Sequence, residues 1–506
     1  SSHYHKKKVR PRKKMIERFW LGRYFISWIA KRKIRKQTKG VFPAPLRAVS
    51  VLERTHLWGM RLGLLYEANV CSRLAIHSIS KELIHLFYVS EALKKDNGVK
   101  SQVQLLDIQS VGVLGAGLMG GGIAWLMSSK DYFVRIRDIE WPFISKAFFA
   151  AYSIYQRRVK RKRLRVHDFL RKWSKISATL SLDTFHHMDL VIEAIPENMA
   201  LKKKVFMELE EKVSHDAIIA TNTSALSVTE MASELRYPNR FVGMHFFSPV
   251  HRMPLVEVIG ADKTDEKTIA TIVSFSKKLG KVPIVVKDSP GFLINRLLLP
   301  YVNEAIYLIQ DYVPISVIDK TMTQFGMPIG PLMLADEVGL DVGYKVLQIL
   351  EKAFGQRMAI SEIFSILMQE SRFRGKKTGE GFYIHKGKKA TPNSALMAHL
   401  KSTDKKSVSK KEVQKRMLMI MINEATRALE EKVVSCPKYL DMAMILGTGF
   451  PVFRGGLLRY ADTIGAKVIV DTLQQFSETY GERFLPSSYL IELASQNKCF
   501  YNQKRS

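Results

Sequence analysis

The chain contains 506 residues, of which 46% are hydrophobic and 25% are charged. This length predicts two to four domains, and this balance is typical of a protein with buried cores; it excludes fibrous, collagen-like and wholly disordered chains. Three cysteines (Cys71, Cys436 and Cys499) are too few for a disulfide framework, and no CxxC pair indicates a zinc site. We therefore expect no metal and a reducing, cytoplasmic compartment.

Positive charge is concentrated near the N-terminus. The chain has 79 Lys and Arg against 47 Asp and Glu, a formal net charge of +32, and residues 1–40 hold fifteen of the cations and one acid, Glu17. Residues 1–45 are therefore predicted to form a basic arm. Such an arm can bind nucleic acid or an anionic lipid surface, and it can equally be a solvated tail, so its role stays open.

No segment predicts a membrane-spanning helix. The most apolar run, residues 111–127, is 17 residues long but includes six glycines, which indicates a strand followed by a tight turn. The N-terminus also lacks the apolar core and small-residue cleavage site of a secretory signal.

Residues 46–105 are predicted to form a helical linker, because apolar residues recur there at three- and four-residue steps until Asp96-Asn97-Gly98 interrupts them. The following part alternates short apolar runs with helical patterns. This alternation is typical of a doubly wound α/β sheet of the Rossmann type, which we expect over residues 106–289.

Beyond Pro290-Gly291 the sequence predicts helices almost to its end, and it repeats itself. The first series comprises Asn303-Glu304-Ala305, Asp319, Gly326, Gly330-Pro331 and Asp336, and the second, about 120 residues later, comprises Asn423-Glu424-Ala425, Asp441, Gly447, Gly455-Gly456 and Asp462. We therefore predict a helical domain at residues 290–390 and a second copy at residues 391–506, packed on each other.

The motif Gly115-Ala-Gly117-Leu-Met-Gly120 follows a strand-like run, residues 110–114, and opens a helical run. The first two glycines allow a tight turn and the close approach of a pyrophosphate, and the third lets the helix pack on the strand. The start of the helix supplies N–H donors to the phosphates. In this context the motif predicts a dinucleotide site.

Asp138 ends the next strand-like run, eighteen residues after the last glycine of the motif. An acid at this place suits the ribose diol of NAD and would repel a 2′-phosphate. Because Arg135 and Arg137 are close by, the sequence favours NAD without excluding NADP.

His245 and Glu257 each lie in a strand-like run, and the turn-forming residues 248–254 separate them. If the turn is centred on His251, the two side chains fall opposite each other on neighbouring strands. The carboxylate would then fix one imidazole nitrogen and leave the other free as a base, which oxidation of an alcohol beside a nicotinamide requires. A core histidine that is merely paired with a buried acid is the alternative that this spacing allows.

Two further polar segments are candidates for the same site. Residues 221–224 (Thr-Asn-Thr-Ser) follow the strand-like run 217–220, and Asn295 follows Pro290-Gly291-Phe292. The carboxyl ends of strands in such sheets bind ligands. A turn or a helix cap would also explain either segment.

Six segments of the chain occur in a characteristic order: Gly115–Gly120 with Asp138, Glu193-Ala-Ile-Pro-Glu197-Asn198, Thr221-Asn-Thr-Ser224, Gly243-Met-His245-Phe-Phe-Ser248-Pro, Lys287-Asp-Ser-Pro-Gly291-Phe-Leu-Ile-Asn295-Arg296 and Gly375-Lys-Lys-Thr-Gly379-Glu-Gly381-Phe-Tyr383. Together they resemble the L-3-hydroxyacyl-CoA dehydrogenase family. With its helical duplication, the chain is most similar to the dehydrogenase portion of the multifunctional alpha subunit of the fatty-acid oxidation complex. The stretch 43–96 resembles the linker that follows the enoyl-CoA hydratase domain there.

The resemblance implies NAD-dependent oxidation of (S)-3-hydroxyacyl-CoA to 3-oxoacyl-CoA in fatty-acid beta-oxidation. It implies that His245 is the catalytic base and that Glu257 orients it. It further implies that Ser224 contacts the substrate's 3-hydroxyl and that Asn295 holds the reacting group near the nicotinamide.

The resemblance also implies a cofactor site. Asp138, Glu197, Lys202 and Asn222 match positions that contact NAD in the family, as do the three glycines of the motif. Ser248 stands where many members have Asn, so we expect altered hydrogen bonding there rather than a loss of activity.

For partners, the resemblance implies an acyl-CoA substrate and a thiolase subunit. Because no hydratase domain precedes the linker in this sequence, we do not assign hydration to the chain; the enoyl-CoA hydratase is either a separate polypeptide or a domain that was lost or cut off. Single-repeat relatives dimerise through the helical domain, so the second copy is expected to supply that surface internally. Two alternatives stay open: a non-catalytic subunit that binds a partner, lipid or nucleic acid through its basic arm, and a dehydrogenase of free 3-hydroxy acids.

Overall fold

The computed structural model describes residues 19–387, 389–399 and 408–501. The chain divides into two units: the N-terminal unit, residues 1–88 with 452–455, and the main unit, formed by the remaining residues. The first eighteen residues of the predicted basic arm lie outside the described residues. In the part of the chain that the structure describes, no helix is both long enough and apolar enough to cross a bilayer.

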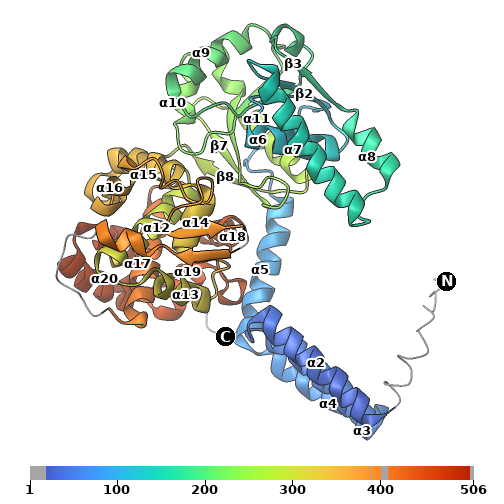
Figure 1. Cartoon of the computed structure of the whole chain (residues 1–506), viewed down its shortest axis with the longest axis vertical. Helices are drawn as coiled ribbons and strands as arrows, with labels where there is room; N and C mark the ends of the chain where they lie inside the picture. The colour runs from blue at the N-terminus through green and yellow to red at the C-terminus, as the bar shows by residue number, and fades with distance from the viewer. Residues whose placement is uncertain (1–18, 388, 400–407, 502–506) are drawn as a thin grey trace. The chain divides into compact units, whose positions relative to one another are not determined.

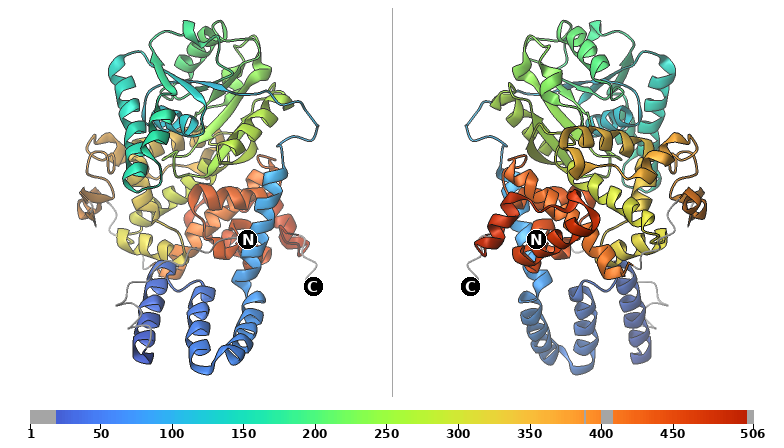
Figure 2. Two further views of the ribbon diagram at one scale, coloured as in Figure 1. Left: turned by 90° about the vertical axis from the view of Figure 1, so that its right-hand side faces the viewer. Right: turned by 90° about the vertical axis from the view of Figure 1, so that its left-hand side faces the viewer.

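Helices make up the N-terminal unit: α2 (Trp20–Thr38), α3 (Pro43–Trp58), α4 (Met60–Ala75) and the first part of α5 (Ser78–Lys95). Helices α2, α3 and α4 lie side by side (Figure 2). The described part of the predicted arm, residues 19–45, thus comprises the helix α2 and the start of α3.

The N-terminal unit has almost no core. Among the described residues 19–88, only Gly63, Val70 and Leu86 are buried. Gly63 lets α4 approach α3 closely, because a Cβ at this position would overlap the side chain of Thr55. The apolar side chains whose spacing predicted helices, such as Leu52, are mostly exposed. The helical prediction is confirmed, but apolar spacing here does not mark a buried face.

An eight-stranded sheet organises the first part of the main unit (Figure 1). Its strands are β1 (Ser110–Leu114), β2 (Phe133–Arg137), β3 (Ile176–Thr179), β4 (Leu190–Glu193), β5 (Ile218–Thr221), β6 (Phe241–Phe246), β7 (Leu255–Gly260) and β8 (Val282–Lys287). Their order is β3-β2-β1-β4-β5-β6-β7-β8, and all neighbours are parallel except β6 and β7. The predicted doubly wound Rossmann-type sheet is confirmed.

Six α-helices connect these strands: α6 (Leu118–Ser129), α7 (Trp141–Lys160), α8 (Val166–Trp173), α9 (Met199–Glu210), α10 (Val228–Ala232) and α11 (Glu266–Lys278). Two short 3₁₀ turns, η1 (Asp183–Phe185) and η2 (Pro238–Arg240), complete the connections.

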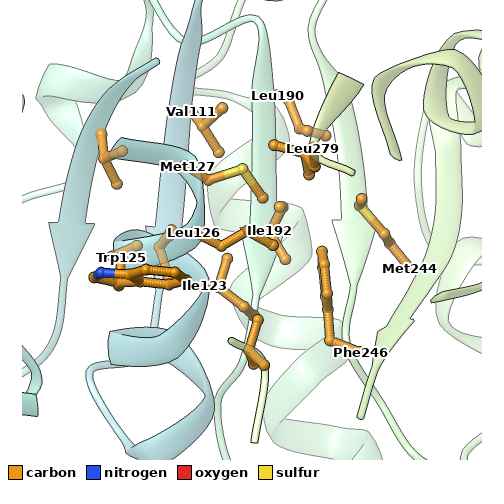
Figure 3. Packing of buried hydrophobic residues seen from close by; sticks show 14 of the residues in the cluster. Val111, Ile123, Trp125, Leu126, Met127, Leu190, Ile192, Met244, Phe246 and Leu279 are labelled. Carbon is orange, nitrogen blue, oxygen red and sulfur yellow. The ribbon is translucent and has the colours of Figure 1, made fainter. Parts of the chain in front are cut away.

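The alternation of side chains along β6 separates the core from the site. Met244 and Phe246 belong to the large apolar cluster that includes Ile123 of α6 and Ile192 of β4 (Figure 3). Since successive residues of a strand point to opposite faces, His245 must point to the other face of the sheet.

Helices dominate the rest of the main unit. They are α12 (Ile294–Gln310), α13 (Ile315–Phe325), α14 (Pro331–Val338), α15 (Leu340–Phe354), α16 (Glu362–Gln369), α17 (Lys410–Glu430), α18 (Pro437–Thr448), α19 (Leu457–Ile464), α20 (Ala466–Tyr480) and α21 (Ser488–Ser495), with the 3₁₀ turns η3 (Gly355–Met358), η4 (Ser394–His399), η5 (Val452–Arg454) and η6 (Glu482–Phe484). The sequence did not predict the antiparallel hairpin of β9 (Tyr383–Lys386) and β10 (Lys389–Pro392), which spans the proposed border at residue 390.

Reciprocal ion pairs join the two helical copies where α12 packs on α17. Arg296 donates from Nε to Glu424 (2.7 Å), and Arg416, 120 residues later, donates from Nε to Glu304 (2.7 Å). Both guanidinium groups are fully buried. If the two copies are exchanged, each contact takes the place of the other. This is the pattern of a two-fold symmetric interface, here within one chain.

Each copy also contains the same buried carboxylate. Asp319 accepts hydrogen bonds from two successive backbone N–H groups at the start of α14 and from Tyr383 Oη. Asp441 does the same at the start of α19, and there Tyr501 donates the third bond. These equivalences support the predicted duplication.

The Arg416→Met variant should lower the free energy of unfolding by about 3 kcal/mol, because it removes the buried cation that pairs with Glu304 and Asp311 and leaves Glu304 with Arg483 as its cation. Urea unfolding followed by circular dichroism measures this. Arg165→Met, which breaks an exposed pair with Asp168, is the matched control and should change stability little. Equal losses in the two variants would contradict the role of the buried pair.

The Asp441→Asn variant should change how stability depends on pH. Burial raises the pKa of Asp441 to about 7, against the hydrogen bonds that it accepts. Between about pH 4 and pH 7 the folded chain therefore keeps a proton that the unfolded chain has lost, so raising the pH destabilises the fold. The unfolding free energy of the wild type, relative to the variant, should fall from about pH 5 to pH 8. Parallel pH curves would disprove this.

Candidate functional site

Four segments meet at the carboxyl edge of the sheet. The glycine motif follows β1, residues 194–198 follow β4, residues 222–224 follow β5, and His245 lies near the end of β6. Because these four strands are parallel, their carboxyl ends lie along one edge. The strand order reverses between β1 and β4, and this reversal creates the crevice in which open α/β sheets bind ligands.

The three glycines of the motif have different structural roles. Gly115 has φ +96°, and a Cβ there would lie 2.5 Å from the carbonyl oxygen of Ala194. A Cβ on Gly120 would overlap the carbonyl oxygen of Gly115. At Gly117, by contrast, nothing lies within 4 Å of an added Cβ. The open space at Gly117, beside the first N–H groups of α6, fits a pyrophosphate.

Asp138 lies directly beside this loop. Its Oδ2 accepts a hydrogen bond from the backbone N–H of Ala116 (2.6 Å), and its Oδ1 accepts one from Ile139 (2.7 Å). The carboxylate is therefore held in place at the end of β2, with lone pairs left for a ribose hydroxyl.

Glu193 is a buried residue at this edge that belongs to one of the six sequence segments but was not among the predicted site residues. It accepts hydrogen bonds from Lys202 Nζ (2.5 Å), Thr221 Oγ1 (2.6 Å) and the N–H of Ile195 (2.7 Å). Burial raises the pKa of Glu193, and the Lys202 ammonium opposes that shift. An acid at the end of an otherwise apolar strand was the signal that could have identified it.

Lys202, a predicted NAD contact, is only 1% exposed. Its Nζ lies 2.5 Å from Glu193 and 3.5 Å from Glu197. Glu197 in turn accepts hydrogen bonds from Thr223 Oγ1 and from the N–H of Ser224 (2.6 Å). The structure thus links these predicted residues into one network, and a direct contact of Lys202 with NAD stays a prediction.

Asn222 and Asn295 each join two of these segments. The Oδ1 atom of Asn222 accepts a hydrogen bond from the N–H of Phe246 (2.8 Å), which ties the end of β5 to the end of β6. Asn295 Nδ2 donates to the carbonyl oxygen of Ser224 (2.9 Å). Within the described residues the Ser224 hydroxyl has no hydrogen-bond partner, so it is available to a ligand.

The register of β6 and β7 places His245 opposite Glu257, as the turn predicted. His245 Nδ1 lies 2.8 Å from Glu257 Oε2. The other carboxylate oxygen accepts from the N–H groups of Leu293 (3.1 Å) and Ile294 (2.9 Å), where α12 begins. The rings of Phe247 and Phe292 flank the imidazole.

Glu257 therefore joins the two pairs of predicted catalytic residues. It is bonded both to His245 and to the backbone of Ile294, and the next residue, Asn295, is bonded to Ser224. Ser248, the departure from the family pattern, is exposed in the turn after β6. A merely structural pairing would explain the histidine and the acid, but not their connection to Asn295 and Ser224.

The glycine motif gives a direct test of the cofactor site. Gly117→Ala should fold like the wild type, because its methyl group enters open space, yet it should weaken NAD binding about tenfold or more, or about 1.4 kcal/mol, by filling the place of the pyrophosphate. Gly120→Ala, the matched variant, should instead lower the melting temperature. Calorimetric titration with NAD and thermal unfolding measure the two effects. Unchanged NAD affinity in Gly117→Ala would place the cofactor elsewhere.

Comparisons with known proteins match both parts of the main unit. The model of the 3-hydroxyacyl-CoA dehydrogenase NAD-binding domain matches residues 110–289, and that of the C-terminal domain matches residues 291–385 and 413–504. The fatty acid oxidation complex subunit alpha of Vibrio vulnificus is 37% identical over 498 residues, which are 98% of this chain and 70% of that protein. Its counterpart from Vibrio cholerae is 38% identical over 492 residues, 97% of this chain and 69% of that protein.

Solved structures give the same result. A 3-hydroxybutyryl-CoA dehydrogenase from Escherichia coli is 27% identical with a TM-score of 0.68, and the match covers 78% of this chain and 99% of that one. An (S)-3-hydroxybutyryl-CoA dehydrogenase from Ralstonia eutropha is 37% identical with a TM-score of 0.53, over 55% of this chain and all of that one. The family resemblance inferred from the six sequence segments is confirmed. The chain belongs to the 3-hydroxyacyl-CoA dehydrogenase family and contains that family's NAD-binding domain.

Proposed function

We propose that this chain oxidises (S)-3-hydroxyacyl-CoA to 3-oxoacyl-CoA, with NAD as the hydride acceptor, at the pair formed by His245 and Glu257. One observation carries this assignment: the pair lies at the sheet edge that also holds the glycine motif, and the carboxylate is fixed by the start of α12. An oriented base beside a dinucleotide site is what alcohol oxidation requires.

The proton is transferred to His245. With Nδ1 bonded to Glu257, Nε2 accepts the proton of the substrate's 3-hydroxyl while the C3 hydride leaves and the C3–O double bond forms. NAD, when bound, supplies the hydride acceptor. The Glu257 carboxylate stabilises the imidazolium that results, and the two backbone N–H groups keep this carboxylate from turning away.

The remaining predicted residues have supporting roles in this proposal. Ser224 Oγ contacts the 3-hydroxyl, and Asn295, bonded to Ser224, holds the reacting group. Asp138 accepts from the ribose diol at the end of β2. Glu197, Lys202 and Asn222 complete the cofactor side of the site.

We further propose that an enoyl-CoA hydratase and a thiolase subunit act with this chain in the cytoplasm. The related Vibrio proteins are named as subunits of a fatty acid oxidation complex. The N-terminal unit exposes many large apolar side chains, among them Tyr24, Trp28, Leu57 and Leu65, and such a surface fits an interface with another protein. Co-purification of tagged chain with either subunit would test the assembly.

His245→Ala and Glu257→Gln should each reduce turnover of (S)-3-hydroxybutyryl-CoA by about 10²–10⁴-fold, because general-base catalysis is lost, while NAD binding persists. NADH absorbance measures turnover and calorimetry measures binding.

The matched control is His385→Gln. This variant alters a second buried histidine–carboxylate pair, His385 with Asp336 (2.9 Å), in the first helical copy. It should keep most of the turnover of the wild type. Near-normal turnover in either site variant would refute the assignment, and activity on free 3-hydroxybutyrate instead of the CoA ester would favour the alternative substrate class. Absence of all turnover with NAD bound would favour a non-catalytic subunit.

A further inference from the structure

The turn between β6 and β7 connects the strands that carry His245 and Glu257. Its backbone is tight: the N–H groups of Arg252 (2.9 Å) and Met253 (3.1 Å) both donate to the carbonyl oxygen of Pro249. Two other carbonyl oxygens of the turn, those of Val250 and Met253, accept hydrogen bonds from the Nζ atom of one side chain, Lys281.

Lys281 reaches the turn from an adjacent part of the sheet. It immediately precedes β8, which pairs with β7, and the side chain is 9% exposed. Within the described residues no carboxylate forms an ion pair with it. A buried ammonium that is held by two carbonyl dipoles is costly unless both bonds are formed, so the lysine and the turn fix each other.

The same turn packs on the helix that begins at the dinucleotide loop. Val250 is buried against Gly122 of α6, where an added Cβ would lie 3.1 Å from the valine side chain. The ring of His251 lies edge-on to Trp125, also of α6, with centroids 6.0 Å apart. The turn is therefore one contact, besides the apolar cluster of the sheet, through which β6 and β7 are placed relative to α6.

We propose that Lys281 is a positioning residue for the dehydrogenase reaction: its ammonium holds the turn of residues 248–254 and thereby keeps His245 and Glu257 aligned with the dinucleotide site. This inference rests on the proposed function. It adds a residue that touches neither substrate nor cofactor and acts through the backbone of the turn.

The surroundings of Lys281 make its hold on the turn sensitive to pH. Burial and, to a smaller extent, the charge of Lys130 just after α6 together lower the pKa of Lys281 to about 8. The other charged groups around the turn are also cationic, Arg252, Arg157 and Arg158; burial and these cations lower the pKa of His251, so its imidazole is neutral above pH 7. As the pH rises through about 8, the ammonium loses its charge and the two bonds to the turn weaken. Turnover should then fall, although alkaline pH favours release of the substrate's proton.

A matched lysine provides the control. Lys277, at the end of α11, also caps two backbone carbonyl oxygens, those of Lys94 and Asp96, and burial also lowers its pKa. These carbonyls belong to the end of α5 and the residue after it, not to the catalytic strands. Lys277→Met therefore removes a similar lysine-to-carbonyl interaction, at a half-buried position, without altering the turn.

The experiment measures kcat and KM for (S)-3-hydroxybutyryl-CoA from about pH 7 to pH 10 in full-length wild type, Lys281→Met, Lys281→Arg and Lys277→Met. Lys281→Met should lose kcat by about tenfold to a hundredfold with a small change in KM, since the base is misplaced. Lys277→Met should keep the wild-type kcat. Lys281→Arg, which stays charged, should restore kcat and abolish the alkaline decline that the wild type displays.

Two results would overturn the proposal: a kcat of Lys281→Met within about twofold of that of Lys277→Met, or an identical alkaline decline in Lys281→Arg and wild type. If Lys281→Met fails to fold, the pH profiles of Lys281→Arg and wild type decide alone. If Lys281→Arg also fails to fold, a wild-type kcat that stays level to about pH 10 overturns the proposal and a decline centred near pH 8 supports it. A wild type without turnover at any pH contradicts the proposed function itself, which is a distinct outcome.

Discussion

A single buried carboxylate, that of Glu257, connects the parts of the main unit that must act together. It belongs to β7, is bonded to His245 of β6, and accepts two N–H groups where α12 begins. A carboxylate that is shielded from water is stable only when its oxygen atoms accept hydrogen bonds. The N–H groups at the positive end of a helix donate such bonds. The sheet and the first helical copy therefore cannot separate without exposing this acid.

The connection continues through α12 into the second copy. Two residues after Ile294, the buried guanidinium of Arg296 is bonded to Glu424 of α17 and to Glu431 beyond it. One helix thus contacts Glu257 at its start and the duplicate two residues later. The position of the site is set by the packing of the two copies as well as by the sheet.

The sequence was sufficient to predict the features that depend on residues close together in the chain. The turn between His245 and Glu257 fixed their register, and the glycine motif with Asp138 located the dinucleotide loop. Patterns of this kind extend over a dozen to about twenty residues, within which strand and turn geometry leave few choices.

Other features depend on contacts between residues that are distant in sequence. No local pattern indicates that Arg296 pairs with Glu424, 128 residues away, or that Lys281 caps the turn that follows β6. The exposure of the apolar residues in α3 and α4 was also unpredictable, because helical spacing does not reveal whether a partner covers the face. These features follow from tertiary packing and needed the structure.

The fusion of the two helical copies has a consequence for their evolution. In a dimer of identical chains, every substitution at a two-fold interface appears twice, so both halves must tolerate it. Here the halves are free to differ, and they do: Arg416 is bonded to Asp311, whereas Arg296 meets Glu431 at the equivalent position. Because the two copies belong to one chain, each is also at a high effective concentration for the other. The packing of α12 on α17 therefore persists at any dilution of the protein.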